Sequence, residues 1–198
     1  PWYIQTMMYR LTDAFKQKNK SKILHLSADI GHYIADSNVP LHTSENYNGQ
    51  MTNQVGIHGL WESRIPELYG DNYDYMIGKA EYVAKPSDRI WATVLESNHA
   101  LDTVLGFEKI LLDSFPSDRI YSFETRGKSL VKVYSEEFAG TYSQMMDGMV
   151  ERRMRSAIKM VADIWYTCWV NAGSPDLNKL ETTPLSPEEQ QKIDAEEK

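Results

Sequence analysis

The sequence has a single cysteine, Cys168, among its 198 residues. One cysteine excludes an intrachain disulfide and a cysteine-based zinc cluster, so any transition-metal site must use His, Asp or Glu side chains. Apolar residues form no run long enough to cross a bilayer, which predicts no stable membrane insertion. The formal net charge of −7 provides no general excess of basic residues. This argues against sequence-independent binding of nucleic acid through a basic surface.

Most of the chain has the periodicity of helices. Its 41% hydrophobic and 25% charged residues are ordinary for a globular protein, and its length suffices for one domain with a substantial core. The residues 121–134, YSFETRGKSLVKVY, instead alternate around Arg126-Gly127, which predicts a β-hairpin. Helices are predicted where apolar residues recur at helical spacing, over residues 1–20, 21–35, 57–67, 86–112 and 134–170. The sequence therefore predicts an all-α fold with one small β-hairpin.

The two ends of the chain differ in character. Gly173 and Pro175 form a typical stop signal after the last helix. Residues 1–173 are accordingly predicted to form a single helical domain, and residues 174–198, rich in Glu and containing Pro, a mobile acidic tail. The helical pattern is already present at Pro1, so we expect this domain to lack its N-terminal part.

Three of the five histidines lie between His32 and Glu62. His32 and Asp36 are four residues apart in a predicted helix, which places them on one face. Such a pair by itself is more often a surface hydrogen bond than a pair of ligands. His58 and Glu62 repeat the spacing in the next helix, and His42 follows the turn between the two helices. Two imidazole nitrogens and one carboxylate oxygen are a common protein ligand set for catalytic zinc, so the combined pattern predicts a metal site.

The other candidate residues have simpler interpretations. His25 lies one heptad before His32 and is expected to be structural or to support a ligand, and His99 is expected at the surface or in packing. Cys168, between two tryptophans, is expected to be a small buried residue. The charged residues from Glu151 to Arg155 are typical of a solvated helix face.

The order of these residues resembles a known family. His32, Tyr33, Asp36, Pro40 and His42 form the pattern H-Y-x-x-D-x-x-x-P-x-H. This pattern resembles the motif of the zinc-dependent phospholipase C and single-strand-specific nuclease superfamily. The later H-x-x-x-E, from His58 to Glu62, lies where that superfamily has a second His-xxx-acid pair.

The resemblance implies a multi-helix, phospholipase C/nuclease-like bundle with up to three zinc ions in the complete protein. Such an enzyme is a phosphodiesterase that hydrolyses phospholipid or single-stranded nucleic acid with metal-activated water. His32 would bind one zinc of a close pair, Asp36 would bridge that zinc and a third, and His42, His58 and Glu62 would hold the remaining ion. Family members are usually exported, which implies a secreted or periplasmic protein.

Within that interpretation, Asn48 is a candidate for substrate binding. It lies in a loop soon after His42, where its amide would donate to a phosphate oxygen, although an Asn-Gly sequence is more often only a turn.

The chain departs from the family pattern upstream of the motif. The family uses an N-terminal Trp, a following His, an Asp and a further His as ligands, and no matching residues precede His32. Trp2 follows Pro1 within a predicted helix and is no substitute. We therefore expect fewer than three zinc ions and little activity in this chain. A non-catalytic, zinc-stabilised helical binding protein and a metal-free helical domain are the alternatives.

Overall fold

The computed structural model describes residues 1–180, which divide into two compact units. The first unit contains Pro1–Ile34, Lys79–Arg89 and residues 159–180, and the second contains Ala35–Gly78 and Ile90–Ile158. Most of the predicted acidic tail, residues 181–198, lies outside the described residues. The prediction of one domain over residues 1–173 stays a prediction.

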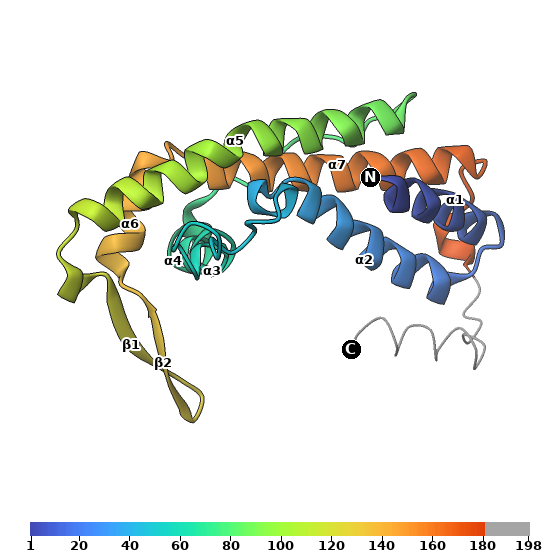
Figure 1. Cartoon of the computed structure of the whole chain (residues 1–198). Helices are drawn as coiled ribbons and strands as arrows, with labels where there is room; N and C mark the ends of the chain where they lie inside the picture. Colours follow the sequence, from blue (N-terminus) through green and yellow to red (C-terminus); the bar gives the residue numbers. More distant parts are fainter. Residues whose placement is uncertain (181–198) are drawn as a thin grey trace. The chain divides into compact units, whose positions relative to one another are not determined.

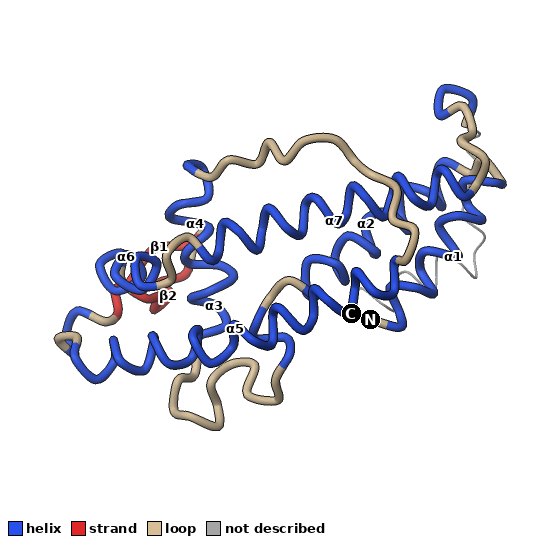
Figure 2. The backbone as a smooth tube through the Cα atoms, turned by 90° about the horizontal axis from the view of Figure 1, so that it is seen from above, coloured by secondary structure: helices blue, strands red, loops and turns tan. Residues whose placement is uncertain are grey.

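The predicted fold class is confirmed, because helices account for most of the described chain and the strands belong to a hairpin (Figures 1 and 2). No helix within residues 1–180 is both long and apolar enough to cross a membrane. The helices are α1 (Trp2–Lys16), α2 (Lys20–Ser37), α3 (Ile57–Gly59), α4 (Ile65–Tyr69), α5 (Pro86–Ser114), α6 (Glu136–Met145) and α7 (Met149–Asn171). Strands β1 (Tyr121–Arg126) and β2 (Ser129–Tyr134) pair antiparallel, with Tyr121 opposite Tyr134 and Arg126 opposite Ser129.

The first unit is held together by the apolar faces of helices. Asn19 precedes α2 and caps it, because its side-chain oxygen accepts a hydrogen bond from the Lys22 backbone amide at 3.1 Å. Cys168 is fully buried, as predicted, and burial raises the pKa of its thiol to about 11. The buried side chains include Ile4, Met7 and Leu11 from α1, Ile23, Ile30 and Ile34 from α2, and Met160, Ile164 and Cys168 from α7.

The core of the second unit is rich in aromatic residues. The Phe138 ring lies 5.2 Å from the Tyr134 ring and 5.3 Å from the Phe115 ring, measured between centroids. The Tyr142 hydroxyl donates to the Val104 carbonyl at 2.8 Å, which satisfies a polar group inside the core. These contacts join α5, α6 and the base of the hairpin within one unit, which also contains the candidate site.

Two predicted helices are interrupted. The helix predicted over residues 134–170 is two helices, because Asp147 (φ 46°) and Gly148 (φ 70°) both adopt left-handed conformations that a helix cannot continue through. The helix predicted over residues 57–67 contains a π turn, Leu60–Arg64, and then continues to Tyr69. Pro66 lies in the first turn of α4.

Long irregular segments are also fixed in place. Between α4 and α5 the chain is mostly without regular structure, and Figure 2 shows it as a long loop. In the first unit the Glu81 amide donates to the Asp163 carboxylate at 2.7 Å, and the Val83 amide donates to the Thr167 hydroxyl at 2.9 Å. Side chains of α7 thus supply the hydrogen bonds that a strand partner would otherwise provide.

Candidate metal centre

His42 is presented by a short turn after α2. Pro40–Thr43 forms a 3-10 turn in which Pro40 and Leu41 are buried and His42 faces outward. The Thr43 hydroxyl donates to the Pro40 carbonyl at 2.7 Å and closes this turn. Asp36, in the last turn of α2, has its Oδ1 3.9 Å from His42 Nε2. The buried residues of the turn therefore direct the imidazole away from the core.

Arg153 and Ser97 anchor the same turn from α7 and α5. Arg153 Nε donates to the Asn38 carbonyl at 2.9 Å, and the Ser97 hydroxyl donates to the Ser37 carbonyl at 2.6 Å. The Arg153 side chain is only 11% exposed. The prediction that this charged run is a solvated helix face is therefore wrong for Arg153, whose guanidinium donates to the Asn38 carbonyl just after α2 and to the Thr93 carbonyl of α5.

The loop before α3 is held by its own polar side chains. Asn46 accepts a hydrogen bond from the Met51 amide at 2.8 Å and donates to the Thr52 hydroxyl at 3.0 Å. Gly49 has a φ of 73°, and a side chain there would lie 2.3 Å from the Gln54 carbonyl oxygen. The position therefore requires glycine.

Gln54 connects this loop to the core of the second unit. Its amide donates to Glu108 Oε2 and to the Leu105 carbonyl, both at 2.7 Å. The Tyr134 hydroxyl donates to the other Glu108 oxygen at 3.3 Å. Glu108 is fully buried, and burial raises the pKa of its carboxyl group despite these hydrogen bonds. The network fixes the position of the loop, and sequence patterns gave no sign of it.

A backbone oxygen of this loop, that of Tyr47, contacts a residue of the candidate site. The Tyr47 carbonyl oxygen lies 3.0 Å from His58 Nδ1. A carbonyl can only accept, so the ring proton of a neutral His58 lies on Nδ1 and leaves Nε2 as the electron-pair donor. This is the arrangement by which histidine ligands are usually oriented in metal sites.

Glu62 lies in the π turn that directly follows α3, whose N-cap is Gly56. Pro66 has no N–H to donate to the Glu62 carbonyl, and its ring crowds that carbonyl, which accounts for an irregular turn at this place. Single π turns within α-helices are frequent at functional sites. The turn keeps His58 and Glu62 on one side of the helix despite the irregular spacing.

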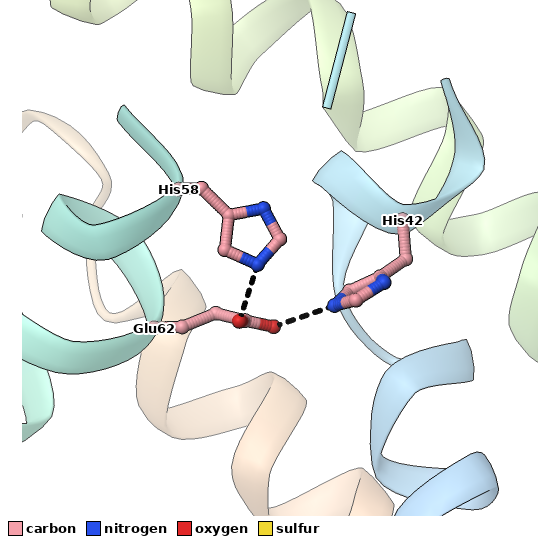
Figure 3. Close-up of side chains that lie close together, drawn as sticks. All are labelled: His42, His58 and Glu62. Atoms are coloured by element: carbon pink, nitrogen blue, oxygen red, sulfur yellow. Dashed lines mark hydrogen bonds and ion pairs between the residues drawn. The ribbon is translucent and has the colours of Figure 1, made fainter. Parts of the chain in front are cut away.

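The two imidazoles and the carboxylate converge, as Figure 3 shows. His42 Nε2 lies 3.1 Å from Glu62 Oε1, and His58 Nε2 lies 2.6 Å from Glu62 Oε2. One ligand atom from each of the three residues lies within 4.8 Å of the others. The side chains of His42, His58 and Glu62 are 35%, 23% and 27% exposed, so water reaches the group.

These distances suit a divalent metal. In a tetrahedral zinc site with bonds near 2 Å, ligand atoms are separated by about 3.3 Å. His42 Nε2 and His58 Nε2 lie 3.1 and 2.6 Å from different oxygens of Glu62, so the side chains must shift for one nitrogen of each ring and one carboxylate oxygen to surround a single ion. With Nδ1 of His58 protonated, the electron pair of Nε2 faces a carboxylate oxygen, and this contact needs a cation between the two atoms. A proton or a metal ion meets that need.

The charges at the site are mutually stabilising. The hydrogen bond to Glu62 raises the pKa of His42 above its ordinary value of 6.5; burial opposes this, and the charges of Glu62 and Asp36 add to it. Burial acts to raise the pKa of Glu62, but interactions with His42 and His58 hold that pKa below its ordinary value of 4.5. Without metal, the group is therefore an ion pair over a range of mildly acidic pH.

This ion pair predicts a pH-dependent stability for the metal-free protein. His42 contributes fully below its ordinary pKa of 6.5, and the contribution is lost as pH rises through its raised pKa in the folded protein. Glu62 contributes above 4.5, and its contribution is lost as pH falls through its lowered pKa. In chelator, Glu62→Gln should therefore lower the free energy of unfolding more at about pH 6 than at about pH 9. An equal loss at both pH values would contradict the ion pair.

The structure brings together only part of the predicted ligand set. His42, His58 and Glu62 form a group, and Asp36 lies beside it. His32 belongs to the first unit, where its ring contacts the Tyr33 ring at 5.6 Å between centroids, and its proposed role at a second zinc stays a prediction. Asn48 accepts a hydrogen bond from the Gly56 amide at 3.1 Å through its side-chain oxygen. Its role in substrate binding also stays a prediction.

The remaining histidines agree with their simpler interpretations. His25 Nε2 lies 3.1 Å from Asp29 Oδ2, one turn along α2, in a local pair typical of a helix surface. His99 is exposed on α5. Among the described residues, the group that could hold a metal ion is His42, His58 and Glu62, and it includes neither His25 nor His99.

Comparisons with models of protein families, with curated proteins and with solved structures gave no match. The resemblance to the phospholipase C and nuclease superfamily therefore depends on the motif residues from His32 to Glu62.

Proposed function

We propose that this protein is a zinc-dependent phosphoesterase that hydrolyses phosphodiester bonds in phospholipid or single-stranded nucleic acid. The observation that carries the proposal is the Glu62 carboxylate lying between His42 Nε2 and His58 Nε2, at 3.1 and 2.6 Å. The three residues come from separate elements of the second unit. They are also the three that the family pattern assigns to one zinc ion.

The surroundings of the group suit catalysis better than a closed structural site. Three protein ligands leave one tetrahedral position for water or substrate, whereas structural zinc sites usually have four protein ligands. The side chains are between 23% and 35% exposed, which gives a substrate access to that position. Zinc bound there would lower the pKa of a water molecule and polarise a phosphoryl oxygen.

The residues of the chain would have distinct roles. His42 and His58 would donate nitrogen electron pairs, and the Tyr47 carbonyl, 3.0 Å from His58 Nδ1, would hold one imidazole in the required tautomer. Glu62 would supply one negative charge. Asp36, with its carboxylate 3.9 Å from His42, would add a second negative charge that favours cation binding. Because His42, His58 and Glu62 form a complete set, we propose one zinc per chain at this centre. From the family resemblance we also propose a secreted or periplasmic protein.

The decisive experiment measures zinc content and hydrolysis on the same preparation. Zinc-loaded protein is assayed on single-stranded DNA and on phosphatidylcholine, beside Glu62→Gln and the control Glu45→Gln. Glu45 is an exposed acid in the loop before α3, so its replacement tests the effect of charge alone. We expect wild type and Glu45→Gln to bind about one zinc and to hydrolyse one substrate slowly, because the upstream ligands of the family pattern are not present, and Glu62→Gln to lose about a hundredfold or more of that rate.

The outcomes separate the alternatives. Zinc bound at His42, His58 and Glu62 without hydrolysis of either substrate would favour the non-catalytic, zinc-stabilised binding protein. Equal zinc content and equal rate in wild type and Glu62→Gln would place both metal and activity elsewhere, and the proposal would be wrong.

A further inference from the structure

The β1–β2 hairpin exposes large apolar side chains. Phe123 is 67% exposed and Leu130 is 69% exposed. In the observed register Phe123 lies opposite Lys132, and Leu130 lies opposite Thr125. Opposed residues of an antiparallel pair share a face, and residues two apart on a strand share it as well. Phe123 and Leu130 therefore lie on one face of the hairpin, which extends away from α6 (Figure 1).

The hairpin also differs in charge from the rest of the chain. The chain carries a net charge of −7, whereas residues 121–134 contain three basic residues and one acidic residue. Glu124 is neutralised by Arg64, whose Nη2 lies 2.5 Å from Glu124 Oε1. Among the described residues, no carboxylate lies within ion-pair distance of Lys128 or Lys132. Lys132 lies over the Tyr121 ring, 3.6 Å from its centroid.

The opposite face of the hairpin is fixed to the rest of the second unit. Arg64 Nε donates to the Tyr134 carbonyl at 2.9 Å, and Arg126 Nη2 lies 2.6 Å from Glu67 Oε2. At the base of the hairpin, on the same face as Phe123, the Tyr134 side chain is buried in the core. Attachment at the base and along one face holds the hairpin in a defined position. Because the backbone of Phe123 and Leu130 is already ordered, binding of a partner to them loses little backbone conformational entropy.

We propose that the β1–β2 hairpin docks on the surface of anionic phospholipid membranes. Phe123 and Leu130 would enter the interfacial region, and Lys128 and Lys132 would lie among the negatively charged headgroups. An apolar face with Lys132 beside it and Lys128 at the turn, in an otherwise acidic chain, is complementary to such a surface in both respects. A single strand of nucleic acid fits less well, because it calls for a track of several cations and for several stacking aromatic rings, whereas the two most exposed apolar side chains of this face are one ring, Phe123, and the aliphatic Leu130.

This docking does not require the proposed metal centre. The hairpin residues are separate from His42, His58 and Glu62, so membrane binding should survive a change that removes zinc. If both proposals hold, the hairpin brings the site to a phospholipid substrate. If only the docking holds, the protein is a peripheral lipid-binding protein.

The test is sedimentation of the full chain with vesicles. One set contains phosphatidylcholine alone, and the other contains equal parts of phosphatidylcholine and phosphatidylserine. We expect binding to the mixed vesicles and little binding to the neutral ones. Phe123→Thr combined with Leu130→Thr should weaken binding about a hundredfold, because two apolar anchors are lost. Lys128→Gln and Lys132→Gln should each weaken it about fivefold at low salt.

Threonine keeps a preference for strands, so the anchor variants should remain folded, and circular dichroism checks this. Met76→Thr is the matched control, because Met76 is 86% exposed in the same unit but lies outside the hairpin. It should bind vesicles like wild type, and so should Glu62→Gln. The last variant distinguishes failure of docking from failure of the metal centre.

Several results would overturn the docking proposal. Equal binding to both kinds of vesicle, or unchanged binding by the Phe123/Leu130 double variant, would contradict the docking proposal. Light scattering is measured in parallel. A dimer that the double variant converts to a monomer would show that a second copy of the chain covers this face. Loss of binding to single-stranded DNA, with vesicle binding unchanged, would assign the hairpin to nucleic acid.

Discussion

Replacing His58 by alanine is expected to lower the zinc affinity of the second unit by about a hundredfold or more. The change removes one of two nitrogen donors and leaves the Glu62 carboxylate without the partner that lies 2.6 Å from it. It also removes the ring N–H that donates to the Tyr47 carbonyl. Isothermal titration of the metal-free protein with zinc measures the affinity directly.

His99→Ala is the matched control for this prediction. His99 is exposed and lies outside the metal-binding group, so its replacement should leave zinc affinity within about twofold of wild type. Thermal unfolding gives a second measure. Zinc at about a hundred times its Kd should stabilise wild type by about 2.7 kcal/mol and should stabilise His58→Ala far less at the same concentration. Equal stabilisation of both proteins by zinc would show that His58 is not a zinc ligand.

The second large effect concerns the core that supports the site. Phe138→Ala is expected to reduce the free energy of unfolding by about 3–5 kcal/mol. Phe138 is fully buried, and its ring contacts those of Tyr134 and Phe115 at 5.2 and 5.3 Å between centroids. Alanine would leave a cavity in the aromatic cluster where the base of the hairpin meets α6. Denaturant unfolding followed by tryptophan fluorescence gives the measurement.

Two control variants separate volume from aromatic contact. Phe138→Leu retains most of the volume and should cost less than about 1.5 kcal/mol. Phe123→Ala removes an aromatic ring of the same size that is 67% exposed, and it should change stability by about 0.5 kcal/mol or less. A loss below about 1 kcal/mol for Phe138→Ala would contradict the described packing.

Periodicity in the sequence predicted α1 and α2 because each of them buries an apolar stripe, whereas the buried face of α5 also contains Thr93, Ser97 and Glu108. The alternation around Arg126-Gly127 predicted the hairpin, and the structure has its turn there, although most of the hairpin side chains are exposed. The break at Asp147 and Gly148 was not predicted, because a glycine inside a helical pattern is tolerated in many helices.

The candidate site was predictable from local spacing only in part. His58 and Glu62 are four residues apart, so their proximity follows from helical geometry. His42 is separated from them by a loop, and its position depends on the Asn46 and Gln54 hydrogen bonds that shape the chain between the two helices. Arg153 was assigned to solvent because charge patterns carry no information on tertiary partners.

The sequence by itself determined the helical character, the hairpin and the choice of imidazole and carboxylate as possible metal ligands, since these depend on neighbouring residues and on residue type. Only the tertiary structure decided that His42 Nε2 and His58 Nε2 lie on either side of one carboxylate, that the Tyr47 carbonyl faces His58, and that the hairpin leaves Phe123 and Leu130 exposed. Each of these features joins groups distant in the chain or depends on what covers a surface, and both are set by packing rather than by local spacing.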